Sequence, residues 1–246
     1  MKRISLILLM TLLTLTGLKA SGPDSLYVLC LGNSFTYFYD SPKMLESIAA
    51  SEGHCLIVRA EAVGGYSFYR HLQDLKSISA IEARAYDIVF LQDQSQAAAR
   101  YGSDKKRYKL IAKDACALVS RVRMYSPEGR IYIERTWAYE GNHIGGFPSV
   151  EVFDKYLAQG TQAIAKHAKA SVSPIGEAFA LCRQERPDIR LFEPDNKHQS
   201  ASGSYLKSCV NYQLIYHQPF DERVTDCELD PEQAAFLRSL AERVTR

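Results

Sequence analysis

Ser34, Asp195 and His198 are the residues whose types and spacing could carry acid–base and nucleophilic chemistry. Ser34 closely follows the apolar segment 26–31, so it would lie where a buried strand ends. Asp195 and His198 are three positions apart, a spacing that can bring two side chains to one side of a single turn. The carboxylate can then orient one ring nitrogen, while the other removes the proton of a serine hydroxyl and returns it to a leaving alcohol. This set predicts acyl transfer through a serine nucleophile.

Each pattern also has a structural interpretation. A serine between a strand and a helix is often a helix N-cap, and an isolated Asp-x-x-His sequence is often a solvated loop. A phosphate-binding loop at Ser34 is excluded because its lysine and second glycine are absent. We interpret the other histidines as surface or structural residues, with His143 as the second choice of base because its loop is expected at the same sheet edge; they are His54, His71, His143, His167 and His217.

These residues need a scaffold that brings the two ends of the chain together. Apolar strand-like runs alternate with segments of helical spacing, which is typical of βαβ units and a parallel sheet. Strand-like runs cover residues 26–31, 55–63, 87–91, 130–136 and 170–175. Helical spacing covers residues 42–52, 69–83, 104–125, 150–169 and about 200–217, and a last helix opens at Asp230. Because open parallel sheets place function at the carboxyl ends of their strands, the loops after these runs are expected to form the site.

The order of these blocks resembles the SGNH (GDSL-like) hydrolases, in particular an exported bacterial branch associated with polysaccharide degradation. Gly32-Asn33-Ser34 is similar to the family's first block, with Asn33 where aspartate is commoner, and residues 195–198 match its Asp-x-x-His block. Segments 174–179 and 198–206 resemble the same branch. The resemblance covers nearly the whole chain after residue 20. It implies an α/β fold, a three-layer α/β/α flavodoxin-like sandwich with a five-stranded parallel sheet, and Ser34, Asp195 and His198 as catalytic residues.

The resemblance also implies an oxyanion hole. The second block would contribute a glycine amide, from either Gly64 or Gly65. The third block departs from the family's Gly-x-Asn-Asp and reads Gln-Asp-Gln-Ser from Gln92. Glutamine offers the same amide donor one methylene further out. Gln94 matches by block position and Gln92 by its resemblance to carbohydrate-esterase branches, so both are candidates.

Aromatic residues near these blocks could contact a substrate. Trp137 is the only tryptophan and follows the fourth strand-like run, where its ring could stack on a sugar. Its structural alternative is to fill a gap, with the indole N–H bonded to backbone. The glycine-rich loop 138–149 is a candidate lid. Four tyrosines flank the same blocks and could form a wall of the site, at positions 37, 39, 66 and 69.

The composition fits one globular domain, because 46% of the 246 residues are hydrophobic and 24% are charged. Residues 1–20 have the layout of a secretory signal peptide, and their apolar run, 4–18, is short for a membrane span, which needs about 20 residues. We therefore expect a single domain, 21–246, that is secreted or periplasmic in a bacterium and not stably inserted in a membrane. Removal of Lys2, Arg3 and Lys19 leaves 27 basic and 28 acidic residues, a net charge of −1. With no basic run, a nucleic-acid partner is excluded.

The six cysteines form an even set, which is compatible with disulfides in an exported chain. Cys209 and Cys227 are the first choice of pair because both lie near the end of the chain. The sequence has no CxxC and no HExxH, so we expect no metal, and nothing in it implies an organic cofactor.

The sequence and the resemblance together favour a serine esterase that removes short acyl groups, acetyl above all, from carbohydrate. A lipase, a lysophospholipase or an acyltransferase could use the same three residues. A catalytically silent glycan-binding module is the alternative from a different class, because a fold does not fix a function. The partner is then an acylated carbohydrate or another small ester, and the sequence does not indicate an oligomeric state.

Overall fold

The computed structural model describes residues 25–139 and 145–246. The expected signal peptide and His143 lie outside this described part. Within it, five strands form one sheet in the order β2-β1-β3-β4-β5. Their bounds are β1 Leu26–Gly32, β2 Leu56–Ala62, β3 Ile88–Leu91, β4 Arg130–Glu134 and β5 Ser171–Ser173. All four pairings are parallel, and this order is the flavodoxin-like one, in which the chain changes direction between β1 and β3.

Side chains of the central strands alternate between two cores, as the period of a strand requires. On β1, Val28 and Cys30 belong to one core, while Leu29 and Leu31 belong to the other. β3 repeats this division, and its four residues are all buried. A strand covered on both faces reads as a continuous apolar run, which is why these strands were recognisable in the sequence.

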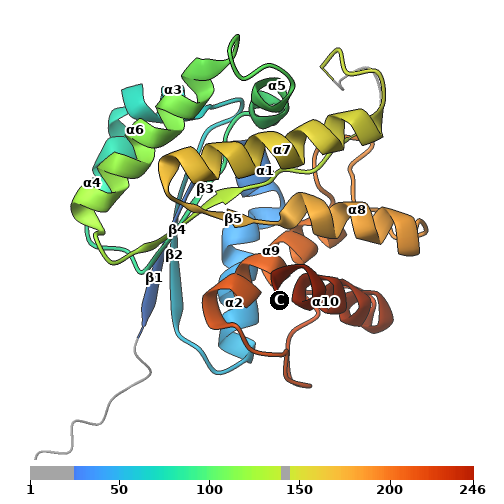
Figure 1. Cartoon of the computed structure of the whole chain (residues 1–246). Coiled ribbons are helices and arrows are strands. Elements are labelled where there is room, and N and C mark those ends of the chain that lie inside the picture. Colours follow the sequence, from blue (N-terminus) through green and yellow to red (C-terminus); the bar gives the residue numbers. More distant parts are fainter. Residues whose placement is uncertain (1–24, 140–144) are drawn as a thin grey trace, which may run out of the picture.

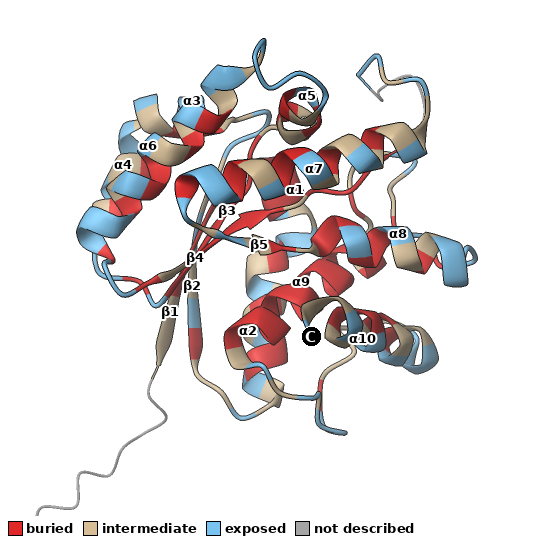
Figure 2. Cartoon of the chain, in the orientation of Figure 1, coloured by how far each residue is buried: buried red, intermediate tan, exposed pale blue. Residues whose placement is uncertain are grey.

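Helices cover both faces of the sheet, which confirms the expected three-layer α/β/α architecture (Figure 1). α2, α8, α9 and α10 lie on one side and α3, α4 and α6 on the other, while α7 runs past β5 and contributes to both cores. α9 is buried along almost its whole length, as Figure 2 shows. The helices are α1 Ser34–Tyr37, α2 Ser41–Ser51, α3 Phe68–Gln73, α4 Leu75–Glu82, α5 Ala97–Ser103, α6 Lys109–Tyr125, α7 Val150–Ala168, α8 Ile175–Glu185, α9 Ala201–Tyr216 and α10 Pro231–Thr245, with a 3₁₀ turn, η1, at Phe38–Asp40.

The helices differ from the expected ones in one segment that is divided and in two helices that were not expected. The segment 69–83 is not one helix, because Asp74 takes an extended backbone and caps α4 by accepting a hydrogen bond from the Ser77 N–H. The sequence does not predict α5 and α8, since the apolar residues of neither follow a long amphipathic pattern. No helix in the described residues is both long and apolar enough to cross a membrane.

The expected Cys209–Cys227 disulfide is wrong. All six cysteines are free thiols, and Cys209 is fully buried in α9. Cys30 and Cys182 are also core residues. These thiols act as small apolar side chains that fill the interior, which is their common role when buried.

Candidate active site

Ser34, His198 and Asp195 meet at the carboxyl edge of the sheet although 164 positions separate the serine from the histidine. His198 Nε2 lies 2.8 Å from Ser34 Oγ, and His198 Nδ1 lies 2.5 Å from Asp195 Oδ2. With Asp195 ionised, the neutral imidazole donates its Nδ1 proton to the carboxylate and accepts the serine hydroxyl proton at Nε2. The two sequence blocks are thus joined into one hydrogen-bonded chain of the kind that activates a serine.

Asp195 is held in its ionised form by the turn around it. Burial alone would raise the pKa of this carboxyl, but hydrogen bonds from the His198 ring and from the backbone N–H groups of His198 and Lys197 outweigh it and lower the pKa. Both backbone groups donate to Oδ1, at 2.9 and 3.0 Å, which leaves Oδ2 for the imidazole. The carboxylate therefore fixes the ring orientation and its tautomer.

The loop that carries these two residues is a closed hairpin. Phe192 and Gln199 form an antiparallel bridge, and the Glu193 N–H donates to the His198 carbonyl at 2.8 Å. Asn196 turns the chain with a positive φ of 55°. The ring of His198 stacks on Phe38 at 4.3 Å, so backbone and side-chain contacts both restrict the base.

Asn33 ties the loop of the nucleophile to the two neighbouring loops. Its side-chain amide donates to the carbonyls of Tyr66 and Asp93, at 2.9 and 3.2 Å, and its Oδ1 accepts from the Phe35 N–H and so caps α1. An aspartate here could cap the helix but could not make the two donated bonds. His71, buried and bonded through Nε2 to the Gly32 carbonyl at 3.0 Å, supports the same turn, and its burial lowers its pKa.

A buried ion pair supports the residue next to the nucleophile. α1 has only four residues, so the Phe35 carbonyl has no helical partner and needs another donor. Lys207 Nζ donates to this carbonyl at 3.0 Å and to Glu134 Oε2 at 2.6 Å, and Gln199 Nε2 also donates to the carbonyl at 3.0 Å. Both charged side chains are less than 5% exposed. Glu134, Gln199 and Lys207 carry no pattern by which a reading of the sequence could single them out.

Gln92 does not provide an oxyanion donor, which corrects one of the two expectations for the third block. It is 1% exposed, and its Oε1 accepts from the Asn33 N–H at 3.0 Å and from Thr36 Oγ1 at 3.1 Å. Its Nε2 donates to the Asp93 carbonyl. The side chain is therefore a buried brace under the nucleophile turn.

Gln94 is placed differently. It is half-buried, its Oε1 accepts from the Gln96 N–H at 2.9 Å, and its Nε2 has no acceptor in the described part of the chain. The backbone N–H groups of Ser34, Gly64 and Gly65 likewise lack acceptors among the described residues. Gly65 has a φ of 74°, which suits a glycine at the third position of the 63–66 turn. Both glycines are exposed, so each remains a candidate donor.

Trp137 is not a substrate platform. Its ring is 1% exposed and lies between Phe35 and Phe179, stacked on them at 4.3 and 4.4 Å. The indole N–H donates to the Lys197 carbonyl at 3.0 Å. The structural alternative therefore holds, because both faces of the ring are covered and its N–H binds the loop that carries His198.

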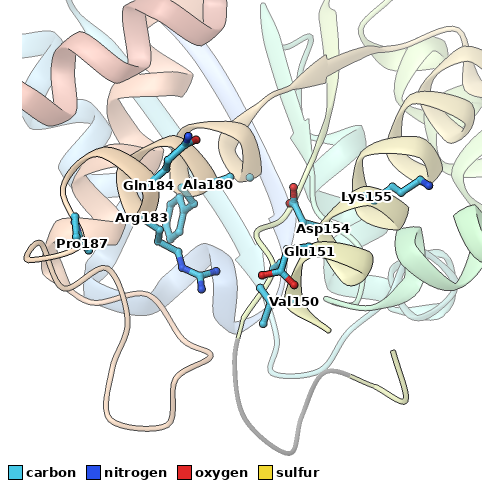
Figure 3. A pocket seen from close by; sticks show the side chains of 11 residues that line it. Val150, Glu151, Asp154, Lys155, Ala180, Arg183, Gln184 and Pro187 are labelled. Atoms are coloured by element: carbon cyan, nitrogen blue, oxygen red, sulfur yellow. The ribbon is translucent and has the colours of Figure 1, made fainter. Parts of the chain in front are cut away.

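A cavity of about 650 Å³ lies between α7 and α8. In Figure 3, Arg183 of α8 faces Glu151 and Asp154 of α7 across it. Phe179 lines this cavity and also stacks on Trp137, so the aromatic stack separates the cavity from Ser34. No group of three or more His, Cys, Asp or Glu side chains in residues 25–139 and 145–246 is arranged to hold a metal ion.

No protein-family model and no curated protein matches this chain. Solved structures share its fold. A DUF4886 family protein from Bacteroides uniformis has a TM-score of 0.75 at 20% identity, over 90% of this chain and 95% of that one. A candidate SGNH hydrolase from Slackia heliotrinireducens has a TM-score of 0.62 at 22% identity, over 78% and 100%. A catalytic mutant of an acetylxylan esterase from Geobacillus stearothermophilus has a TM-score of 0.51 at 15% identity, over 76% and 94%. The fold is that of the SGNH hydrolases.

Proposed function

We propose that this protein is a serine esterase that removes short acyl groups, acetyl above all, from carbohydrate. The observation that carries the proposal is the unbroken hydrogen-bonded chain from Asp195 through His198 to Ser34, with spacings of 2.5 and 2.8 Å. The histidine and the serine are both partly open to solvent, so an ester can reach them.

The first half of the reaction forms an acyl enzyme. Ser34 Oγ attacks the ester carbonyl carbon while its proton passes to His198 Nε2, and Asp195 stabilises the resulting imidazolium. The carbonyl oxygen takes up the negative charge. When this tetrahedral species collapses, the bond to the alcohol oxygen breaks and His198 delivers its proton to that oxygen. The products are a free alcohol and an ester of Ser34.

The second half releases the acid. Water loses a proton to His198 Nε2 as it attacks the acyl carbon, and the proton then returns to Ser34 Oγ when the acyl bond breaks. In both halves the oxyanion would accept hydrogen bonds from the free N–H groups near the nucleophile, namely those of Ser34, of Gly64 or Gly65, and of the Gln94 side chain. Such preorganised donors contribute about 3 to 4 kcal/mol each to transition-state stabilisation.

Three observations support a short acyl group on a polar alcohol. Ser34 and His198 lie at a partly open surface of the described residues and line none of five cavities of about 330 to 650 Å³, which suits a short acyl group better than a long chain that needs an enclosed channel. Acetylxylan esterases are among the proteins that share the fold. The secretory layout of residues 1–20 would place the enzyme where extracellular polysaccharide is found.

The test is a substrate screen with the wild type and Ser34→Ala. Initial rates are measured on p-nitrophenyl esters of two to twelve carbons and on acetylated polysaccharides. We expect activity on the acetyl and propionyl esters, release of acetate from at least one polysaccharide, and neither activity in Ser34→Ala. Highest rates on esters of eight or more carbons would indicate a lipase. A protein whose Ser34 reacts with a fluorophosphonate but which hydrolyses none of these esters would contradict the proposal.

A further inference from the structure

Tyr37 lies beside the nucleophile on an exposed face of α1. It is three positions after Ser34, so the two side chains project from the same side of the helix. The two residues between them, Phe35 and Thr36, are buried. Tyr37 itself is 43% exposed, which is unusual for a large aromatic side chain this close to a candidate catalytic group.

The ring of Tyr37 is held in place. It stacks on Phe38 with ring centroids 5.7 Å apart, and Phe38 stacks on His198 at 4.3 Å. Its hydroxyl lies 3.3 Å from the position a Cβ would take at Gly64. Tyr37 therefore spans from the base to the glycine turn that carries candidate oxyanion donors.

The backbone after Tyr37 holds the ring stack of Tyr37, Phe38 and His198 in place and adopts a strained conformation to do so. Tyr39 and Asp40 have φ angles of 51° and 46°, in the left-handed region that non-glycine residues rarely adopt. The turn lets the Tyr39 hydroxyl donate to Glu193 Oε1 at 2.5 Å, on the loop of His198, and lets the Asp40 side chain cap α2. The backbone of Phe38 is held as well, since its carbonyl accepts hydrogen bonds from the hydroxyls of Ser41 and Ser204.

We infer that Tyr37 is a binding surface for the sugar ring of the substrate, an inference that rests on the esterase activity proposed above. Because Tyr37 lies on the same side of α1 as Ser34 and its hydroxyl lies near Gly64, a group attached to an ester bound at Ser34 can contact the exposed part of the Tyr37 ring. A pyranose ring presents a flat C–H face that packs on an aromatic ring and hydroxyls that bond at its edge, and the amphipathic tyrosine fits both. An acyl chain fits this place less well, because the surface is open to water.

The experiment compares esters with and without a sugar ring. Values of kcat/KM are measured on ethyl acetate and on acetylated xylobiose and cellobiose for the wild type, Tyr37→Ala, Tyr37→Phe and the control Tyr125→Ala. Tyr125 is 37% exposed and ends α6, which leads into the start of β4 at the opposite edge of the sheet. We expect wild type to prefer the sugar acetates, and Tyr37→Ala to lose about five- to tenfold more of its kcat/KM on them than on ethyl acetate.

Tyr37→Phe should keep most of the sugar-ester activity, since the ring face remains, and Tyr125→Ala should match wild type. An equal loss on all three esters in Tyr37→Ala, or no loss on any, would overturn the inference. So would a wild type that hydrolyses ethyl acetate but shows no preference for the sugar acetates, and in that case the esterase proposal stands. A wild type inactive on every ester would instead refute the proposed function.

Discussion

Two pairs, each of a carboxylate and a basic side chain, end on adjacent residues of the nucleophile turn, and they differ in their access to water. Asp195–His198 ends on the hydroxyl of Ser34, and its side chains are 46% and 20% exposed. Glu134–Lys207 ends on the carbonyl of Phe35, and its side chains are 3% and 4% exposed. We call them the outer pair and the inner pair. A carboxylate with a basic side chain thus contacts the same turn twice, once from the surface and once from the interior.

The difference in exposure assigns different tasks to the two pairs. The imidazole of the outer pair can exchange its proton with substrate and water. Separating the charges of the inner pair inside the protein would cost several kcal/mol, so this pair keeps its charges and acts as a fixed support. The outer pair therefore acts on the reacting hydroxyl of Ser34, while the inner pair holds the backbone of the next residue, Phe35, in position.

The largest effect is expected from breaking the outer pair. His198→Ala should lower kcat/KM by about three powers of ten or more, because it removes the base, while Asp195→Asn should be no more severe, because it leaves a misoriented base. The melting temperature should change little, since His198 is a partly exposed loop residue. Steady-state kinetics and thermal unfolding check this, with the exposed His217→Ala as a control. Retention of more than about one hundredth of the activity in His198→Ala would show that another group is the base.

Breaking the inner pair should act on stability first. Lys207→Met leaves the Glu134 carboxylate buried without its cation, which we expect to cost about 3 to 5 kcal/mol of unfolding free energy. Glu134→Gln with Lys207→Met should recover part of the loss. Lys43→Met removes an exposed pair with Glu46 and should destabilise the fold far less, because water screens that pair. Urea unfolding gives all three values, and equal stabilities of Lys207→Met and Lys43→Met would contradict the fixed-support role.

Gln94 and Gln92 differ in the same way as the outer and inner pairs, because Gln94 is half-buried and Gln92 is buried. Gln94→Ala should lower kcat about 100- to 1000-fold with an unchanged melting temperature, as expected for a lost oxyanion donor. Gln92→Ala should lower stability by about 1 to 3 kcal/mol, because the Asn33 N–H and the Thr36 hydroxyl lose their buried acceptor. Kinetics on a soluble acetyl ester and thermal unfolding of both variants separate the two outcomes. A near-wild-type kcat in Gln94→Ala would exclude the third block from catalysis.

The sheet and the triad could be predicted from the sequence because their signals are local. The apolar runs predict both ends of all five strands to within two residues, and residues 32–34 and 195–198 are short motifs. The inner pair could not be predicted, since Glu134 and Lys207 are 73 positions apart and a lysine is usually exposed. Trp137 shows the same limit, because its place after a strand is visible in the sequence but the rings that cover it are not.

The smallest effect in this series concerns pH, to which only the outer pair should respond. The lowered pKa of Asp195 stabilises the fold above the ordinary value of 3.8, and this contribution is lost only as pH falls below it. Urea unfolding of the wild type and Asp195→Asn from about pH 6 down to pH 2 should therefore show a difference in unfolding free energy that shrinks as pH falls below 3.8. A difference that stays undiminished at about pH 2 would contradict the lowered pKa of Asp195.

The central claim is that the outer pair activates Ser34, and reaction with a fluorophosphonate tests it most directly. Intact mass and peptide mapping would follow the rate of labelling in the wild type, Ser34→Ala, His198→Ala and the Gln94→Ala variant at pH 8. We predict one phosphonyl group on Ser34 in the wild type, none in Ser34→Ala, and labelling slowed by about two powers of ten or more in His198→Ala. Labelling on another residue, or an undiminished rate in His198→Ala, would contradict the claim.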